Sequence, residues 1–209
     1  MAGRFGRIVP FDGAAHGEAL WSAFGGAALN GRISYFGWPD LASADDLVAR
    51  LELMNTSGGW STGTMLVDDR PVGFASYMRE DADHGVVEIG GIAHAEAMAR
   101  TPWSTEAHWL LMRHAFSLGY RRYEWKCDAA NAASRRAAAR LGFVAEGVFR
   151  QHMVTARGRN RDTAWFSVTD GEWPLLRAAF EAWLAPVNFD ADGRQVRSLE
   201  AVRAGLAGG

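Results

Sequence analysis

Three consecutive segments in the middle of the chain alternate like β-strands, and short turns join them. The segments are Thr64–Val67, Val72–Met78 and Val86–Ala93. The connections Asp68–Pro71 and Asp81–Gly85 carry the Asp, Pro and Gly residues that are typical of turns. Strands that follow one another through short turns pair antiparallel. The pattern therefore predicts an antiparallel meander as the centre of a sheet.

Helical patterns precede this meander. The first covers Phe11–Phe24 and has Asp12 as its expected N-cap. A second begins at Ser43, where Asp46 stands three residues later as in a capping box. Within the third strand, the pair Gly90–Gly91 predicts a β-bulge or a close backbone approach.

The strongest helical pattern follows the meander, with an apolar face over Ala107–Leu118, Ser104 as its expected N-cap and Gly119 at its end. The remaining expected elements are a strand at Arg121–Asp128, a helix from Asn131 to Leu141, strands near Val144–Val154 and Thr163–Val168, and a helix from Pro174 to Leu184. This order predicts a mixed α/β (α+β) fold, with a mostly antiparallel central sheet flanked by helices. We expect one domain over residues 1–184 and a loosely packed, Gly- and Ala-rich tail over residues 185–209.

Composition and charge exclude several classes of protein. Hydrophobic residues make up 48% of the chain and charged residues 22%, as in globular domains. With a formal net charge of −2, we expect no nucleic-acid or membrane partner. Cys127 is the sole cysteine, which excludes an intramolecular disulfide and a Cys-rich zinc site. Without a long apolar run, the chain is expected to be cytoplasmic, and it shows no motif for a metal.

One motif indicates a different chemistry. Gly59–Gly63 matches the Gly-x-Ser-x-Gly pattern of serine hydrolases and places Ser61 as the nucleophile. That chemistry needs a strand before the serine and a helix after it. The order expected here is the reverse, so a glycine-rich connection is the competing interpretation.

The segment Arg100–Ala107 joins an expected strand to the start of the strongest helix. Free backbone amides and the helix dipole make such a start an anion site. Pro102 donates no hydrogen bond, but the amides from Trp103 to Ala107 remain. The competing interpretation is an ordinary capped helix start. The candidate ligand-binding residues of this segment are Arg100, Trp103, Ser104, Thr105, Glu106 and Ala107.

Four motifs, in this order and spacing, resemble the GCN5-related N-acetyltransferases. They are Thr105–Ala107, Asn131–Ser134, Arg140–Gly147 and Gly158–Thr163. The resemblance runs from about Phe5 to Leu184 and looks strongest to the branch that contains the ribosomal-protein alanine acetyltransferases.

The resemblance implies acetyl-CoA as the donor and a primary amine as the acceptor. In this family the diphosphate of CoA lies on the turn before the strongest helix, where the family's central glycine is replaced here by Pro102 or Trp103. Asn131 matches the asparagine that bonds the CoA arm, or is a plain N-cap. Many members use a tyrosine as the acid, and Ala138 stands at that position. Ser134 matches a serine that would donate to the departing sulfur, unless its hydroxyl bonds the backbone.

The reaction also needs a group that takes the proton of the amine. Glu88 lies among Val86, Val87 and Ile89, where burial would raise its pKa toward a useful range. It could instead face solvent or pair with an arginine. His152 is the second candidate base, because imidazole titrates near neutrality.

Two further pairs complete the expected site. The amides of Gly91 and Ile92 would polarise the thioester carbonyl and align the CoA arm. Trp38 and Trp60 would clamp the acceptor, unless they serve only in packing.

The sequence thus predicts an acetyl-CoA-dependent N-acetyltransferase in which an amine attacks the thioester directly. The acceptor is a protein N-terminus or a small-molecule amine. The alternatives are a non-catalytic acyl-CoA-binding module on the same fold and, more remotely, a serine hydrolase using Ser61. The sequence does not decide the oligomeric state, and a homodimer is one alternative, since it is the commonest assembly of soluble oligomers.

Overall fold

A computed structural model describes residues 1–155 and 158–208 of the chain. Its described part contains a seven-stranded sheet of order β1-β2-β3-β4-β5-β7-β6. The strands are β1 (Arg7–Pro10), β2 (Trp60–Val67), β3 (Arg70–Asp81), β4 (Val86–His94), β5 (Arg122–Asp128), β6 (Val144–Val154) and β7 (Asn160–Thr169). Every neighbouring pair is antiparallel except β4 and β5, which run parallel. The expected mixed fold and its central meander are confirmed.

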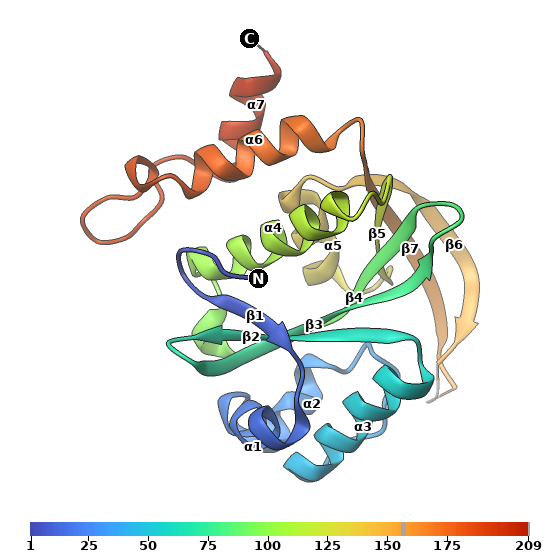
Figure 1. Cartoon of the computed structure of the whole chain (residues 1–209). Helices are drawn as coiled ribbons and strands as arrows, with labels where there is room; N and C mark the ends of the chain where they lie inside the picture. The colour runs from blue at the N-terminus through green and yellow to red at the C-terminus, as the bar shows by residue number, and fades with distance from the viewer. Residues whose placement is uncertain (156–157, 209) are drawn as a thin grey trace.

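Helices cover both faces of the sheet (Figure 1). The α-helices are α1 (Gly13–Ala23), α2 (Leu29–Arg32), α3 (Ala44–Ser57), α4 (Pro102–Ser117), α5 (Ala132–Leu141), α6 (Trp173–Leu184) and α7 (Leu199–Ala207). Short 3₁₀ turns are η1 (Gly26–Ala28), η2 (Glu96–Met98) and η3 (Pro186–Asn188). α1 to α3 lie against the first half of the sheet, and α4 to α6 lie on the opposite face.

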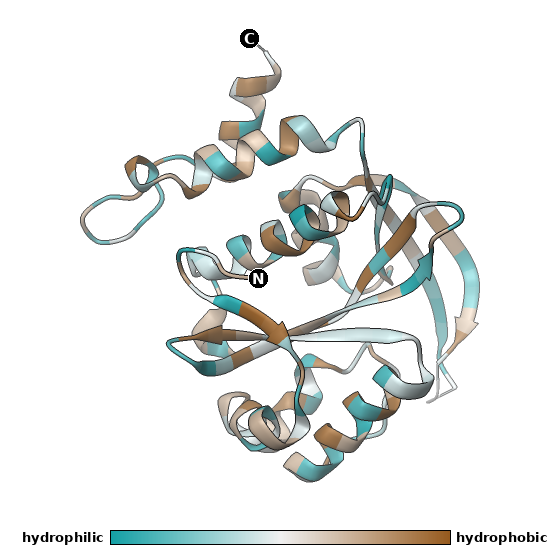
Figure 2. Cartoon of the chain, in the orientation of Figure 1, coloured by the Kyte–Doolittle hydropathy of each residue, from teal (hydrophilic) through white to brown (hydrophobic). Residues whose placement is uncertain are grey.

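Two apolar cores fill the space between these layers. The smaller core joins α1 and α3 to the sheet through Leu20, Leu47 and Phe74. The larger core lies under α4 and includes Leu110 and Tyr123, both fully buried. Hydrophobic and hydrophilic residues alternate along the strands and helices, and the hairpin turns are hydrophilic (Figure 2). Burial of these apolar faces is the main force that holds the layers together.

Local capping follows the sequence closely at three helices. Asp12 accepts the amide of Ala15 at the start of α1, and Ser43 accepts the amide of Asp46 at the start of α3. Asn131 caps α5, and Gly142 ends it in a left-handed conformation. These N-caps satisfy amides that have no partner inside the helix.

The start of α4 differs from the expectation. Thr101 is its N-cap and Pro102 its first residue, so Ser104 already lies inside the first turn. The Ser104 hydroxyl donates back to the carbonyl oxygen of Thr101 over 2.7 Å. Proline suits the first helical position because its missing N–H would have no partner there.

The stretch after α6 also differs from the expectation of a loosely packed tail. η3 and α7 lie within residues 185–208, and Gly209 lies outside the described residues. Leu199 and Val202 of α7 are buried in the larger core. Asn188 ties the stretch together, since its amide donates to the carbonyl oxygens of Trp183 and Arg197. No helix in the described ranges is long and apolar enough to cross a bilayer.

β4 and β5 separate after a short pairing, and this separation positions the site. Their register ends with Glu88 opposite Glu124, although β4 continues to His94 and β5 to Asp128. The pairing of β4 with β3 shifts register between the partners of Phe74 and Ser76, which is the expected bulge. Gly91 has a φ of +54° there, in the region that favours glycine. The bulge bends β4 away from β5 and leaves a gap between the two strands.

A buried carboxylate ties the N-terminal segment to α4. The two oxygens of Glu106 accept the backbone amides of Arg4 and Phe5, over 2.7 and 2.8 Å. The Glu106 side chain is almost fully buried, at 2% exposure. We expect Glu106→Ala to lower the free energy of unfolding by about 2 kcal/mol, because two hydrogen bonds to a charged acceptor are lost. Urea denaturation measures this change.

Glu18→Ala is the matched control, because Glu18 is exposed on α1. Its free energy of unfolding should stay within about 0.5 kcal/mol of the parent. Equal stability of the two variants would show that the Glu106 contacts do not stabilise the fold.

Candidate active site

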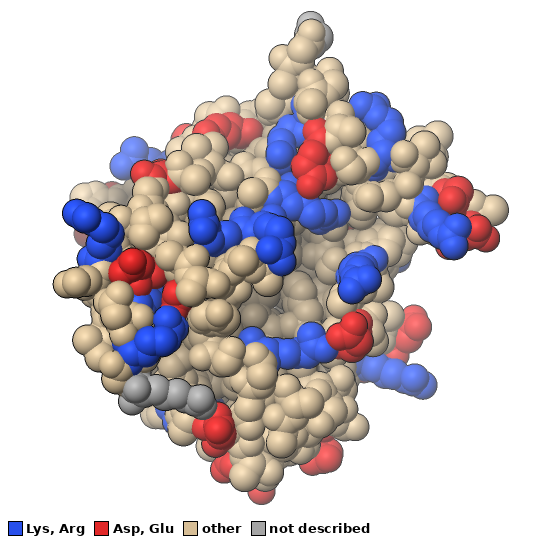
Figure 3. Space-filling view, turned by 180° about the vertical axis from the view of Figure 1, so that it is seen from behind, with Lys and Arg blue, Asp and Glu red and all other residues tan. Residues whose placement is uncertain are grey.

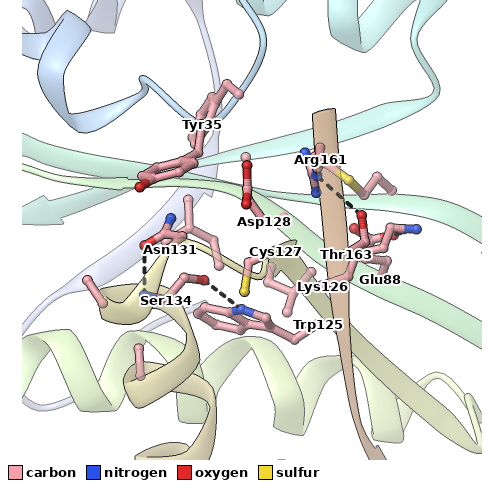
Figure 4. A pocket seen from close by; sticks show the side chains of 18 of the residues that line it. Tyr35, Glu88, Trp125, Lys126, Cys127, Asp128, Asn131, Ser134, Arg161 and Thr163 are labelled. Carbon is pink, nitrogen blue, oxygen red and sulfur yellow. Dashed lines mark hydrogen bonds and ion pairs between the residues drawn. The ribbon is translucent and has the colours of Figure 1, made fainter. Parts of the chain in front are cut away.

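A cavity of about 490 Å³ lies where β4 and β5 separate. Its walls come from the segment after α2 and from β2, β3, β4, β5, α4, α5, β6 and β7. Seen from behind, the surface is hollowed near its centre, and Lys and Arg side chains surround the hollow (Figure 3). The cavity has two sides, with Asn131 and Ser134 on one and Glu88, Lys126 and Arg161 on the other (Figure 4).

The first side is built at the start of α5. Asn131 accepts the amide of Ser134 through its side-chain oxygen over 3.0 Å. The indole N–H of Trp125, a buried residue of β5, donates to the hydroxyl of Ser134 over 2.9 Å. Because this bond uses the oxygen as acceptor, the Ser134 O–H stays able to donate, and the thiol of Cys127, which also lines the cavity, is one group that it meets. Asn131 is thus an N-cap whose side chain also lines the cavity.

Gly91 and Ile92 line the cavity along the edge of β4 that faces β5. A Cβ on Gly91 would lie 2.4 Å from the ring of Trp60, so only glycine fits there. Trp60 also lines the cavity and stacks on Trp38, with 5.9 Å between the ring centroids. Phe36 packs against Trp38 edge to face over 5.2 Å. The two predicted tryptophans therefore meet, with Trp60 at the cavity and Trp38 behind it.

The second side centres on Glu88, which is 3% exposed. Nζ of Lys126 lies 2.6 Å from its Oε2 atom, and Nε of Arg79 lies 3.6 Å from the same atom. Burial raises the pKa of the Glu88 carboxyl above its ordinary value, although the Arg79 and Arg161 guanidinium groups lower it. The sequence left two interpretations of Glu88 open, a buried base and a residue that faces solvent or pairs with an arginine. In the structure Glu88 is both buried and paired with basic side chains.

Lys126 is a functional candidate that the sequence analysis missed. Its ammonium group lies 4.3 Å from the ring centre of Trp165, and its side chain is 5% exposed. Alternation in β5 places Lys126 on the same face as Glu124. Contact with Glu88 also requires β4 and β5 to be neighbours, which no local pattern shows. The signal that the sequence does give is that this is the chain's sole lysine.

Two histidines of the cavity were also missed. His94 of β4 and His108 of α4 line it with ring centroids 5.5 Å apart. Burial lowers the pKa of His94 to about 4 and that of His108 to about 3. Both rings are therefore neutral at physiological pH and add polarity without charge.

His152 lies at the cavity on β6, where its Nδ1 is 2.9 Å from the hydroxyl of Thr163. It is exposed, and it follows Gln151, whose φ of +51° marks an irregularity in the strand. The structure therefore brings His152 to the same cavity as Glu88 and Ser134, the other two candidate catalytic residues.

The segment Arg100–Ala107 lies outside the set of residues that line the cavity. Trp103 and Ala107 are buried in the larger core, and Glu106 binds the N-terminal segment. The hydroxyl of Thr105 accepts a hydrogen bond from Arg140 over 2.9 Å. These side chains therefore have structural partners.

Arg100 and the backbone amides of this segment are the groups that remain for an anion. The Arg100 side chain is exposed, and its backbone has a φ of +60°. The amide of Ser104 donates to the carbonyl oxygen of Thr101 over 3.1 Å. The amides from Trp103 to Ala107 are therefore not all available to an anion, because α4 begins earlier than expected.

The serine-hydrolase alternative finds no support in this geometry. Ser61 is an exposed residue inside β2, so the turn between a strand and a helix that a hydrolase needs is not formed around it. Within residues 1–155 and 158–208, no group of three His, Cys, Asp or Glu side chains is arranged to hold a metal ion.

The comparisons with known proteins identify the family. The profile of the acetyltransferase (GNAT) domain matches residues 17–144. A GCN5-related N-acetyltransferase from Brucella melitensis is 41% identical, with 97% of this chain and 93% of that chain covered and a TM-score of 0.91. The chain therefore belongs to the GNAT acetyltransferases, enzymes that use acetyl-CoA to acetylate their acceptors.

Two other structures show how far the likeness extends. An acetyltransferase of the GNAT family from Chromobacterium violaceum is 38% identical, with 83% of this chain and 87% of that chain covered and a TM-score of 0.77. The Salmonella typhimurium acetyltransferase that modifies the N-terminal serine of ribosomal protein L7/L12 is 19% identical, with 78% and 93% covered and a TM-score of 0.66. At this identity it shares the fold, and membership in the ribosomal branch stays a prediction. No curated protein matches the chain significantly.

The bulge at Gly91 gives a test of the site's architecture. Gly91→Ala should lower the free energy of unfolding by about 1–2 kcal/mol, because an L-residue with a side chain is strained at this φ. The Trp60 ring must also move, which should weaken the binding of acetyl-CoA. Urea denaturation and titration calorimetry measure the two effects.

Gly31→Ala in α2 is the control, since a Cβ there meets nothing within 4 Å. It should leave both stability and binding close to those of the parent. A Gly91→Ala protein as stable as the Gly31→Ala protein, with unchanged affinity for acetyl-CoA, would contradict this description of the bulge.

Proposed function

We propose that this enzyme transfers an acetyl group from acetyl-CoA to a primary amine by direct attack, inside the gap between β4 and β5. The observation that carries the proposal is one cavity with Glu88 on one side and the Ser134 hydroxyl on the other. A proton acceptor and a proton donor on opposite sides suit a transfer in which one atom loses a proton and another gains one.

The residues of the gap fit a thioester carrier. When bound, acetyl-CoA supplies an acetyl group activated by its bond to sulfur. Beyond Glu88, the edge of β4 toward β5 has no pairing strand, so main-chain groups near Gly91 and Ile92 can bond an extended arm. Gly90 and Gly91 add no side chain that would block the gap. The amides there would also polarise the carbonyl of the acetyl group.

The carrier's diphosphate would lie at the start of α4. The exposed Arg100 and the main chain near Trp103 are the groups that would receive it, since the nearby side chains of Thr105 and Glu106 have other partners. The positive end of the helix dipole favours an anion at this place.

Glu88 is the group that would take the proton of the amine. An amine attacks only when its nitrogen is neutral, so its ammonium proton must leave first. A carboxylate whose pKa is raised by burial is a stronger base than an ordinary one. The ammonium group of Lys126 lies 2.6 Å from the carboxylate and holds it in place. His152, at the rim, is the second candidate for the same role.

Ser134 would serve the other end of the reaction. Its hydroxyl is oriented by the indole of Trp125 and can donate to the departing sulfur. Ala138, at the position where many members carry a tyrosine, is fully buried and has no hydroxyl. Ser134 lines the cavity at the start of α5, and its hydroxyl is the group that we assign as this donor.

Replacing Glu88 tests the proton acceptor. Glu88→Gln should lower kcat about a hundredfold, because a general base contributes at least that much. Since burial raises the pKa of Glu88, activity of the parent should fall as the pH drops through a value above the ordinary carboxyl range, and this limb should vanish in the variant. Thiol release from acetyl-CoA with a panel of primary amines, followed over pH, measures both.

Deprotonation of the acceptor's ammonium group also changes activity with pH, but it does so in the parent and in Glu88→Gln alike. A pH dependence that only the parent shows therefore belongs to Glu88. Glu18→Gln, on exposed α1, should keep the parent profile. Unchanged turnover of Glu88→Gln at every pH would remove Glu88 from the mechanism. Binding of acetyl-CoA without thiol release by the parent would favour the non-catalytic module instead.

Replacing Ser134 tests the proton donor. Ser134→Ala should lower kcat about tenfold, the loss expected for one hydrogen bond to a developing charge, with little change in acetyl-CoA affinity. Ser117→Ala is the control, since Ser117 is exposed at the end of α4 and its hydroxyl donates to the carbonyl oxygen of His114. Equal kcat values for the two variants would exclude Ser134 as the donor.

A further inference from the structure

Positive charge exceeds negative charge on the second side of the cavity. Arg79 of β3, Lys126 of β5 and Arg161 of β7 all line it. Two carboxylates line it as well, but the Asp128 carboxylate is bonded by Arg159 from outside the cavity lining. Glu88 is therefore left as the carboxylate that faces these three cations.

Arg161 is the cation best placed to meet a ligand. Its Nε donates to the Thr163 hydroxyl over 3.3 Å, and no ion pair of Arg161 is found in the described ranges. Figure 4 shows Arg161 on the same side of the cavity as Glu88 and Lys126. Arg32, which also lines the cavity, differs from it because it is paired with Glu96 over 2.6 Å. A guanidinium with free N–H groups is suited to bind a carboxylate with two hydrogen bonds.

The positions of Glu88 and Arg79 restrict the shape of the ligand. Glu88 would meet the amine of the acceptor, and Arg79 lies only 3.6 Å from the Glu88 carboxylate. An anionic group that reaches Arg79 therefore lies close to an amine that reaches Glu88. An amine and a carboxylate on the same carbon atom satisfy this condition. A polyamine does not, since its additional positive charges would meet Arg79, Lys126 and Arg161.

The cavity also has large apolar groups in its lining. Five apolar or aromatic side chains line the cavity beside the charged groups: Tyr35, Phe36, Trp60, Met78 and Met153. Aromatic and thioether groups of this kind favour an apolar substituent. The protein N-terminus is a poorer match, because its α-carbonyl is a neutral amide.

We propose that the acceptor is a free α-amino acid with a large apolar side chain, whose carboxylate is bound by Arg161 and Arg79. This inference rests on the proposed acetyl transfer. The neutral α-nitrogen forms a bond to the acetyl carbon while the bond from that carbon to sulfur breaks. The nitrogen's proton passes to Glu88, and the sulfur leaves with the electron pair as a thiolate that accepts a hydrogen bond from the Ser134 hydroxyl. Glu88 then releases its proton to solvent, and the thiolate takes a proton from solvent. The products are an N-acetyl amino acid and free CoA.

Binding of the N-acetyl amino acid product tests whether the acceptor is an α-amino acid. The product has no titratable amine, so only its carboxylate changes the charge. N-acetylphenylalanine and its primary amide differ in one charge, and calorimetry with CoA present measures both. The acid should bind about tenfold more tightly than the amide, as expected for one charge-assisted contact. Arg161→Gln should remove this preference, and Arg161→Lys should keep part of it.

Arg177→Gln is the matched control, since Arg177 pairs with Glu181 on α6 away from the cavity, and it should keep the full preference. Equal or tighter binding of the amide to the parent protein would overturn the proposed class, as would an unchanged preference in Arg161→Gln.

Thiol release from acetyl-CoA with phenylalanine, phenylalaninamide, phenethylamine and spermidine separates the two proposals. Faster release with spermidine or phenethylamine than with phenylalanine would overturn the amino-acid class and leave acetyl transfer intact. No release with any amine, despite bound acetyl-CoA, would contradict the proposed function, and the binding preference would then decide the ligand class by itself.

Discussion

The pairing of β4 with β5 ends at Glu88, and the site depends on that end. Both strands continue beyond it, but the bulge at Gly91 turns β4 away. A fully paired sheet would leave no room between the strands and no free main-chain groups along the edge. The gap instead forms part of a cavity whose lining comes from α4 and α5 as well as from β3, β6 and β7. Groups from elements that are distant in the sequence therefore meet at the same place.

Burial gives this gap its chemical properties. Glu88 lies at the last paired position, where neighbouring strands shield it from water, and this shielding raises its pKa. Removing a charged carboxylate from water costs free energy. The nearby positive charges of Lys126 and Arg79 offset that cost for Glu88. On the other side, burial keeps His94 and His108 neutral. Since Arg32 is paired with Glu96, the excess positive charge of the cavity lies on the side of Glu88.

Local patterns were sufficient for much of the fold. The meander, the caps at Asp12, Ser43 and Asn131, and the bulge at Gly90–Gly91 all follow from turn chemistry and periodicity within a few residues. β1 was missed, because its four residues end in proline and show no extended alternation. α7 was missed because its glycine and alanine content resembles a loose tail.

The site was only partly predictable, for a physical reason. Glu88, Ser134, His152 and Trp60 were found from residue type and family resemblance, and the structure brings them to one cavity. The pairing of Lys126 with Glu88 depends on the parallel contact of two strands that are distant in sequence, which periodicity does not encode. The side chains of Thr105 and Glu106 were assigned to the ligand from their position in a motif, whereas the packing of α4 gives them Arg140 and the N-terminal backbone as partners.

A crystal structure of the chain with bound CoA tests the central claim most directly. The account predicts that the CoA arm lies between β4 and β5, hydrogen-bonded to the main chain near Gly91, with its sulfur within hydrogen-bond reach of the Ser134 hydroxyl. A CoA molecule bound elsewhere, or a gap closed by side chains while CoA is present, would contradict the assignment of this cavity as the active site.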